Sequence, residues 1–237
     1  MNGFMTTLEA HKPVNYFRVA WQSALAAGLC LGLPAGFSLS LILIQQIYHS
    51  PVLESLLDIF QANGLYRIYL VVLTSILWSY LLGRISRYHQ WWWIAAASTL
   101  GILAAWFSPL ANIDGVLYEY RPNLPIHLNY AAAMAGLIGS VTLFVGLAYG
   151  LVLRNIKAAL TMGLTTSVIS ILTLLLTIIL FDRLGIRVGT GNFAMSRVTV
   201  AGLLTSAITG GMVLGVGFTR FVKEERLQMS VQDTENK

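Results

Sequence analysis

Charged side chains are scarce in this chain of 237 residues. Asp, Glu, Lys and Arg together make up 11% of the sequence, whereas hydrophobic residues make up 56%. Soluble domains contain about 25% charged residues, and a soluble fold of this length needs more polar side chains to cover its surface. The composition therefore predicts one membrane domain rather than several globular domains.

Cysteine is nearly absent as well, because Cys30 is the single cysteine. This excludes disulfides within the chain and CxxC-type metal or redox motifs. The net charge of +5 is interpreted as loop topology and attraction to anionic lipid. No cluster of basic and aromatic residues forms a nucleic-acid surface, so the expected partner is the lipid bilayer and not nucleic acid.

Long apolar runs are what the sequence has in abundance. A membrane-spanning helix needs about 20 mostly apolar residues, and six runs qualify, at about 19–44, 66–83, 91–110, 129–153, 158–181 and 198–219. The predicted fold class is an all-α integral membrane protein with six transmembrane helices arranged as three hairpins. A short amphipathic interfacial helix is expected at 51–62, after the first span. The predicted organisation is a cytoplasmic segment 1–18, a membrane domain 19–221 and a disordered polar cytoplasmic tail 222–237.

Basic residues in the short flanks give the orientation. With the N-terminus inside, the inner flanks hold ten of them: Lys12, Arg18, Arg84, Arg87, Arg154, Lys157, Arg220, Lys223, Arg226 and Lys237. The outer flanks hold five: Arg67, Arg121, Arg183, Arg187 and Arg197. This excess predicts a multi-pass protein of the plasma (inner) membrane with both termini in the cytoplasm.

Three arginines recur at the inner ends of the hairpins. Arg87, Arg154 and Arg220 are 67 and then 66 residues apart. Internal repeats are common in transporters, so a repeat of hairpins is one interpretation. The other is that apolar helices of similar length, each ended by Arg, resemble one another by chance.

Small residues at four-residue spacing mark close helix contacts in membranes. They occupy Gly28, Gly32 and Gly36 in the first span, the two pairs Gly136 with Ser140 and Gly146 with Gly150 in the fourth, and the two pairs Gly202 with Ser206 and Gly211 with Gly215 in the sixth. We expect these three spans to form the centre of the bundle and the Leu/Ile-rich fifth span to face lipid. The same stripes are compatible with a homo-oligomer, and both interpretations stay open.

Ionisable residues are missing from the span interiors, apart from Arg67 at the edge of the second span. A carboxylate proton relay and a voltage sensor are therefore excluded. All four histidines lie in flanks or loops; His49 and His127 share the outer side but make a weak metal pair. We assign no catalytic, metal-binding or cofactor-binding residue.

Residues 189–194 match the dinucleotide-binding pattern G-x-G-x-x-A. The match fails in context, because a membrane span follows it and no acidic residue lies about 20 positions on. The loop is notable instead for its arginines. Arg183, Arg187, Arg197 and Arg121 form a candidate outer-loop site for an anion, a lipid or a partner, although pairing with Asp114 or Glu119 is the structural alternative.

These features favour a small permease, or the membrane subunit of a transporter, for a neutral or apolar solute. The chain has no ATP-binding domain of its own, so an ATP-driven transporter would need a separate ATPase chain. The alternative is a non-catalytic accessory or scaffold subunit of a membrane complex. An enzyme acting on lipid through His127, Asp114 or Arg187 ranks last, because their spacing is not diagnostic.

Overall fold

The computed structural model describes residues 14–30, 65–109, 126–184 and 192–235, which are helical apart from short connections. A helical segment at 16–30 is followed by α4 (Leu65–Ser86), α5 (Trp91–Trp106), α7 (Ile126–Val152), α8 (Ile156–Arg183) and α9 (Asn192–Glu235). No strand occurs in these ranges. The all-α part of the predicted fold class is confirmed, and each of these helices overlaps one of the six predicted apolar runs, the first of which is described only to residue 30. The predicted amphipathic helix 51–62 lies outside the described residues.

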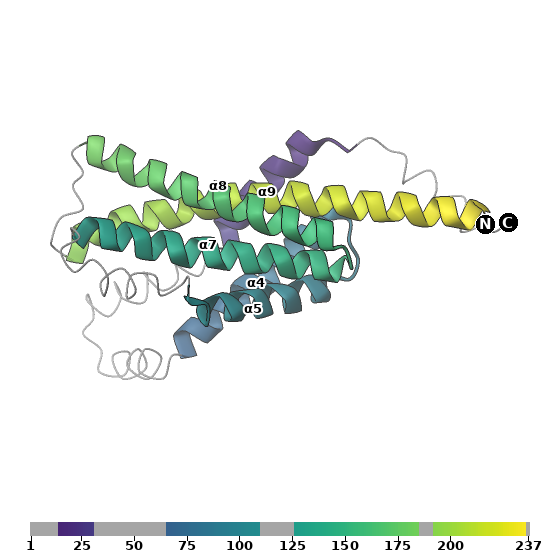
Figure 1. Ribbon diagram of the computed structural model, residues 1–237, viewed down its shortest axis with the longest axis horizontal. Coiled ribbons are helices and arrows are strands. Elements are labelled where there is room, and N and C mark those ends of the chain that lie inside the picture. Colours follow the sequence, from purple (N-terminus) through teal and green to yellow (C-terminus); the bar gives the residue numbers. More distant parts are fainter. Residues whose placement is uncertain (1–13, 31–64, 110–125, 185–191, 236–237) are drawn as a thin grey trace, which may run out of the picture.

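The helices form an elongated bundle, in which α7, α8 and α9 run along the long axis (Figure 1). Neighbours in the chain are neighbours in space: α4 packs on α5, α5 on α7, α7 on α8, and α8 on α9. Helix α9 also contacts α4, which brings the two ends of this series together. The largest side chains buried in the described core are Tyr149, Phe218, Leu82, Ile94 and Met162.

Two of the described helices are long and apolar enough to cross a membrane, at Ala131–Val152 in α7 and Ile156–Phe181 in α8. The apolar parts of α4 and α5 are shorter, at Val71–Ser86 and Trp91–Ala105. Helix α5 has 16 residues, and a rise of about 1.5 Å per residue makes it shorter than a hydrocarbon core of about 30 Å. The described residues therefore support membrane crossing at two of the six predicted spans.

The connections from α4 to α5 and from α7 to α8 have the same backbone geometry. Arg87 and Arg154 have positive φ angles of 58° and 49°, in the left-handed region that usually requires glycine. The next N–H in each turn donates to a carbonyl five residues earlier, Tyr88 to Gly83 at 2.8 Å and Asn155 to Gly150 at 2.9 Å. These are the hydrogen bonds of a Schellman helix end.

Glycine in these two turns lies four residues before the arginine. A Cβ on Gly83 would come within 2.8 Å of Trp91 Cβ, and a Cβ on Gly150 would overlap the backbone of Ala159. Because glycine has no side chain, α5 can pass close to α4 at Gly83, and α8 can pass close to α7 at Gly150. Asn155 then caps α8, because its Oδ1 accepts a hydrogen bond from Ala158 N–H at 3.0 Å.

The third arginine of the series has a different setting. Arg220 lies inside α9, and its Nε donates to Glu224 Oε1 at 2.9 Å. The three nearly equally spaced arginines therefore do not share one setting. Arg87 and Arg154 occupy the same kind of turn, whereas Arg220 lies within an uninterrupted helix. The tail that we predicted to be disordered from residue 222 continues α9 to Glu235 instead, and i,i+4 ion pairs of this kind support helix in a polar segment.

The expected centre of the bundle also needs correction. Helix α8 packs extensively on both α7 and α9, whereas α7 and α9 contact each other little. The reason lies in the two faces of α8. One face is apolar and exposed, as expected for the fifth span, but the other carries the small or hydroxyl residues Ala159, Gly163, Thr166 and Ser170, all buried.

Candidate functional site

A network of polar side chains joins α4, α5 and α7 inside the bundle. Trp78 Nε1–H donates to the hydroxyl of Tyr149 at 2.7 Å. The Tyr149 hydroxyl lies 2.6 Å from Ser98 Oγ. Ser98 Oγ also lies 3.3 Å from Ser79 Oγ. Tyr149 and Ser79 are fully buried, and Trp78 and Ser98 are nearly so.

The direction of these hydrogen bonds follows from the number of available protons. Ser98 Oγ–H donates to the Ile94 carbonyl at 2.8 Å, which uses its single proton. Ser98 therefore accepts from both Tyr149 and Ser79. The Tyr149 hydroxyl accepts from Trp78 and donates to Ser98, so this network is satisfied within the protein and joins three helices.

Three other hydroxyls in the interior have no hydrogen-bond partner within the described residues. They are Ser23 in the segment 16–30, Ser75 in α4 and Thr166 in α8. Ser23 and Thr166 are fully buried and Ser75 is 2% exposed. Buried hydroxyls normally find a partner in the protein or in ordered water, and in an apolar interior an unpaired hydroxyl costs free energy. Within the described residues, the hydrogen-bonding capacity of these three hydroxyls is therefore unused.

Two adjacent glycines of α9 lie between these hydroxyl groups. A Cβ on Gly210 would lie 2.6 Å from Ser170 Oγ and 3.6 Å from Thr166 Cγ2. A Cβ on Gly211 would overlap Ala27 and lie 3.4 Å from the carbonyl oxygen of Ser23. The middle of α9 therefore has no side chain where the segment 16–30 approaches on one side and α8 on the other.

The contact of α8 with α9 is also made by hydroxyls. Ser206 Oγ–H donates to the Ser170 carbonyl at 3.1 Å, and Ser170 Oγ–H donates to the Ser206 carbonyl at 3.5 Å. Elsewhere along the same contact, the hydroxyls of Thr177 and Thr205 lie 3.0 Å apart. Hydrogen bonds of this kind between helices are typical of membrane bundles.

The candidate packing residues lie at several different contacts. Gly146 and Gly150 of α7 face α8, Gly202 faces Leu174 of α8, and Gly28, Gly211 and Gly215 lie between the segment 16–30 and α9. Ser140 Oγ–H donates to the Leu137 carbonyl at 2.9 Å within α7. Gly136 is a half-buried residue of α7. Gly32 and Gly36 lie outside the described residues.

The candidate outer-loop site is described only in part. Arg183 is an exposed residue at the end of α8, and Arg197 belongs to the beginning of α9. Arg121 and Arg187 lie outside the described residues, as do Asp114, Glu119 and His49. In the described ranges, no group of three or more His, Cys, Asp or Glu residues is placed to hold a metal ion.

Comparison of the chain with protein-family models, with curated proteins and with solved structures finds no match. The class that the described residues define is therefore structural. It is an all-helical bundle with a hydroxyl-rich interior and two helices capable of crossing a membrane.

Proposed function

We propose that this protein is a multi-pass integral membrane protein. The observation that carries the proposal is the outer face of α8, where exposed aliphatic residues recur every four positions at Leu160, Leu164, Val168, Leu172, Leu176 and Leu180. The opposite face buries small and hydroxyl-bearing residues. A helix on the surface of a soluble protein has the reverse arrangement, whereas lipid solvates an apolar outer face and leaves small and hydroxyl groups for helix contacts.

Labelling the two ends of α8 tests this placement. In a Cys30→Ser background, a single cysteine replaces Asn155 or Leu184, which are exposed residues just before and just after the helix. A membrane-impermeant maleimide added to intact cells should label position 184 and not position 155, and inverted vesicles should give the reverse. Equal labelling of both positions from one side contradicts the proposal.

Within that membrane domain, we propose transport of a neutral solute. The support is the set of unpartnered interior hydroxyls at Ser23, Ser75 and Thr166, together with the absence of Asp, Glu, Lys, Arg and His from the described core. Hydroxyls offer hydrogen bonds to a polar uncharged molecule, and the described core has no charged side chain that would compensate the charge of an ion. The solute class is therefore small, neutral and hydrogen-bonding.

Two neighbouring threonines of α8 provide a matched test. Thr166 is fully buried without a hydrogen-bond partner, whereas Thr165 is exposed and donates to the Thr161 carbonyl. Thr→Val keeps the shape of the side chain and removes its hydroxyl. Because the Thr166 hydroxyl forms no hydrogen bond within the described ranges, T166V should retain or raise the melting temperature.

The assay is stopped-flow light scattering of proteoliposomes challenged with glycerol or with urea. We expect T166V to lower the flux and T165V to leave it unchanged. Flux no greater than that of empty liposomes with both solutes contradicts transport of this solute class. Equal flux through T166V and T165V contradicts the role of the interior hydroxyl.

The second candidate is an accessory subunit, and one observation favours it. Helix α9 runs well beyond the ends of α7 and α8 (Figure 1), so its last turns offer a surface to another chain. Purification from the native membrane in mild detergent, followed by mass spectrometry, distinguishes the candidates. A stoichiometric partner without ATPase motifs favours the accessory subunit, and an ATP-binding partner favours the transporter subunit.

A further inference from the structure

A cavity of about 390 Å³ lies where α4 ends, beside the start of the helical segment 16–30 and the last third of α9. Five basic residues from these three elements line it: Arg18, Arg84, Arg87, Lys223 and Arg226. None of the described residues that line the cavity is acidic. In the sequence these residues are separated by up to 208 positions, so the fold itself brings this positive charge together.

The carboxylates of α9 that are closest in sequence to the cavity residues, Glu224 and Glu225, do not line the cavity. Glu224 lies next to Lys223 in sequence, but it pairs with Arg220, and neither of these two residues lines the cavity. Glu225 is not a lining residue either, and burial and then its negative charge raise the pKa of Tyr88. Like charges gathered in one cavity repel each other, and this repulsion is relieved when an anion binds among them.

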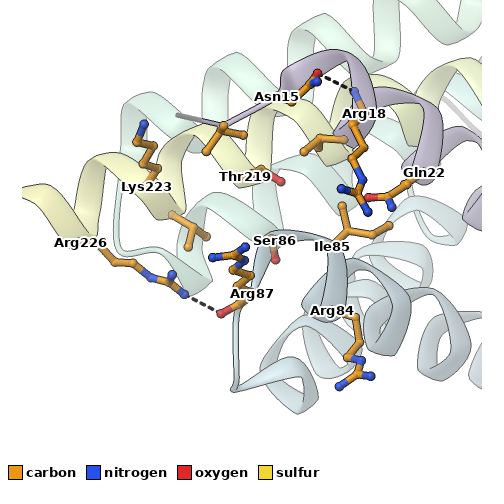
Figure 2. A pocket seen from close by; sticks show the side chains of 13 residues that line it. Asn15, Arg18, Gln22, Arg84, Ile85, Ser86, Arg87, Thr219, Lys223 and Arg226 are labelled. Atoms are coloured by element: carbon orange, nitrogen blue, oxygen red, sulfur yellow. Dashed lines mark hydrogen bonds between the residues drawn. The ribbon is translucent and has the colours of Figure 1, made fainter. Parts of the chain in front are cut away.

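Figure 2 shows how the side chains are arranged. The Arg226 guanidinium donates to the backbone carbonyl of Arg87, which ties α9 to the end of α4. The guanidinium groups of Arg18 and Arg87 lie on the inner side of the cavity, while Arg84 points away from them. The left-handed backbone of Arg87 (φ 58°) is part of the turn that directs the chain around this cavity.

Two further features of the cavity point to an anion. Asn15 lines the cavity and caps the segment 16–30, since its Oδ1 accepts from Arg18 N–H at 3.1 Å, so the positive end of a helix dipole lies at the cavity wall. Thr219 also lines the cavity; it is 5% exposed, and its hydroxyl has no hydrogen-bond partner within the described residues. An oxyanion bound in the cavity would accept a hydrogen bond from the Thr219 hydroxyl.

We propose that this cavity binds a phosphate group. Guanidinium groups match phosphate in charge and in hydrogen-bond geometry, and a tetrahedral phosphate has enough oxygens to accept from Arg18, Arg87 and Thr219, which belong to three different elements. Basic pockets between helices at a membrane surface bind lipid headgroups in this way. The phosphate can come from an anionic lipid headgroup or from a free phosphate, and the inference does not depend on the transport proposal.

The test uses the two arginines with the same turn geometry. Arg87 and Arg154 are both left-handed turn residues, so glycine suits either backbone and each Arg→Gly variant removes one positive charge. Only Arg87 lines the cavity. R154G is therefore the matched control for R87G, and Arg18→Gln is a second cavity variant that keeps the capped backbone N–H.

The full chain is purified in dodecyl maltoside, and thermal unfolding is followed by tryptophan fluorescence at constant ionic strength. The probes are inorganic phosphate and phosphatidylglycerol in mixed micelles, with phosphatidylcholine as the lipid control. For the unchanged protein we expect a higher melting temperature with phosphate, with phosphatidylglycerol or with both. Loss of one charged donor weakens such binding about tenfold, so R87G and R18Q should need about ten times more probe, and R154G should not.

Stabilisation by phosphatidylglycerol alone supports the proposal with a lipid headgroup as the source. Stabilisation by inorganic phosphate alone supports it with a free phosphate, and stabilisation by both supports the shared chemistry. The proposal is overturned if neither probe stabilises the unchanged protein. It is equally overturned if R87G, R18Q and R154G all bind like the unchanged protein, or if all three lose binding to the same extent.

Discussion

Replacing Gly146 by alanine should force α7 and α8 apart. A Cβ at this position would lie 2.6 Å from the Cα and 2.7 Å from the N of Gly163, and 2.8 Å from the carbonyl carbon of Met162. Ordinary contact begins at 3.4 Å. All three atoms belong to the backbone of α8, so no rotation of a side chain can relieve the overlap.

The expected loss of stability follows from two opposing effects. Overpacking of a well-packed core costs about 1–3 kcal/mol, and the rigid backbone contact places Gly146→Ala at the upper end. Alanine is favoured over glycine inside a helix by about 1 kcal/mol, which offsets part of that cost. A net loss of about 2 kcal/mol remains, and for a chain of this size it lowers the melting temperature by roughly 4–8 °C.

A graded series of Gly→Ala variants makes this reasoning testable. At Gly217 the new Cβ meets the flexible side chain of Met162 at 3.1 Å, and at Gly28 it meets Ile208 at an ordinary 3.5 Å. Thermal unfolding in one detergent should give the lowest melting temperature for G146A, a higher one for G217A and the highest for G28A, which should melt at or above the unchanged protein. A G146A variant as stable as G28A would refute the close contact of α7 and α8.

Three further outcomes are expected. Gly215→Ala should destabilise the bundle by about 1–3 kcal/mol, because its Cβ would overlap the Ser23 side chain; adding Ser23→Gly should restore most of the loss, and a double-mutant cycle without coupling contradicts this. Tyr149→Phe leaves the Trp78 indole N–H without its acceptor, so it should cost about 1–3 kcal/mol in thermal unfolding, and an unchanged melting temperature contradicts the network. Burial, and then the Glu225 carboxylate, raise the pKa of Tyr88 against the opposing effect of Arg154. Its contribution to stability is therefore constant below the unfolded-state pKa of about 10 and is lost as the pH rises through the higher folded-state pKa. Tyr88→Phe should flatten melting temperature against pH above about 10, and identical profiles contradict the shift.

Much of the helix order can be predicted from the sequence, because each long apolar run predicts a helix and each short basic connection predicts a turn between two helices. The connections that follow from the predicted spans 66–83, 91–110, 129–153 and 158–181 occur between Ser86 and Trp91 and between Val152 and Ile156. The polar tail was predicted wrongly, since its composition alone does not reveal that it continues an established helix.

Helix partners are harder to predict than helix positions. A stripe such as Gly146 and Gly150 predicts that some backbone comes close, but it does not say which one. The matching small residues Ala159 and Gly163 of α8 lie inside a Leu/Ile-rich run, where the more numerous large residues mask them. Once the fold is known, these pairs explain why α8 contacts two neighbours.

The sites, like the helix partners, depend on which distant residues come together, and the sequence does not show this. The inner-flank count predicts one side of a membrane for Arg18, Arg87 and Arg226, yet it cannot predict that they meet at one cavity. The Tyr149 network has no sequence signal of its own, because a single hydroxyl in an apolar run does not identify its partner on another helix. Convergence of distant residues is a property of packing and not of local composition.

The two Arg-centred turns have a consequence for biosynthesis. Each closes its hairpin with hydrogen bonds made within the turn, at Gly83–Tyr88 and Gly150–Asn155, and the α7–α8 contact joins segments that leave the ribosome one after the other. Contacts between neighbouring segments need little of the chain to be present. The α7–α8 hairpin can therefore assemble before α9 is synthesised, and α9 completes the bundle last by contributing to both the interior hydroxyl region and the basic cavity.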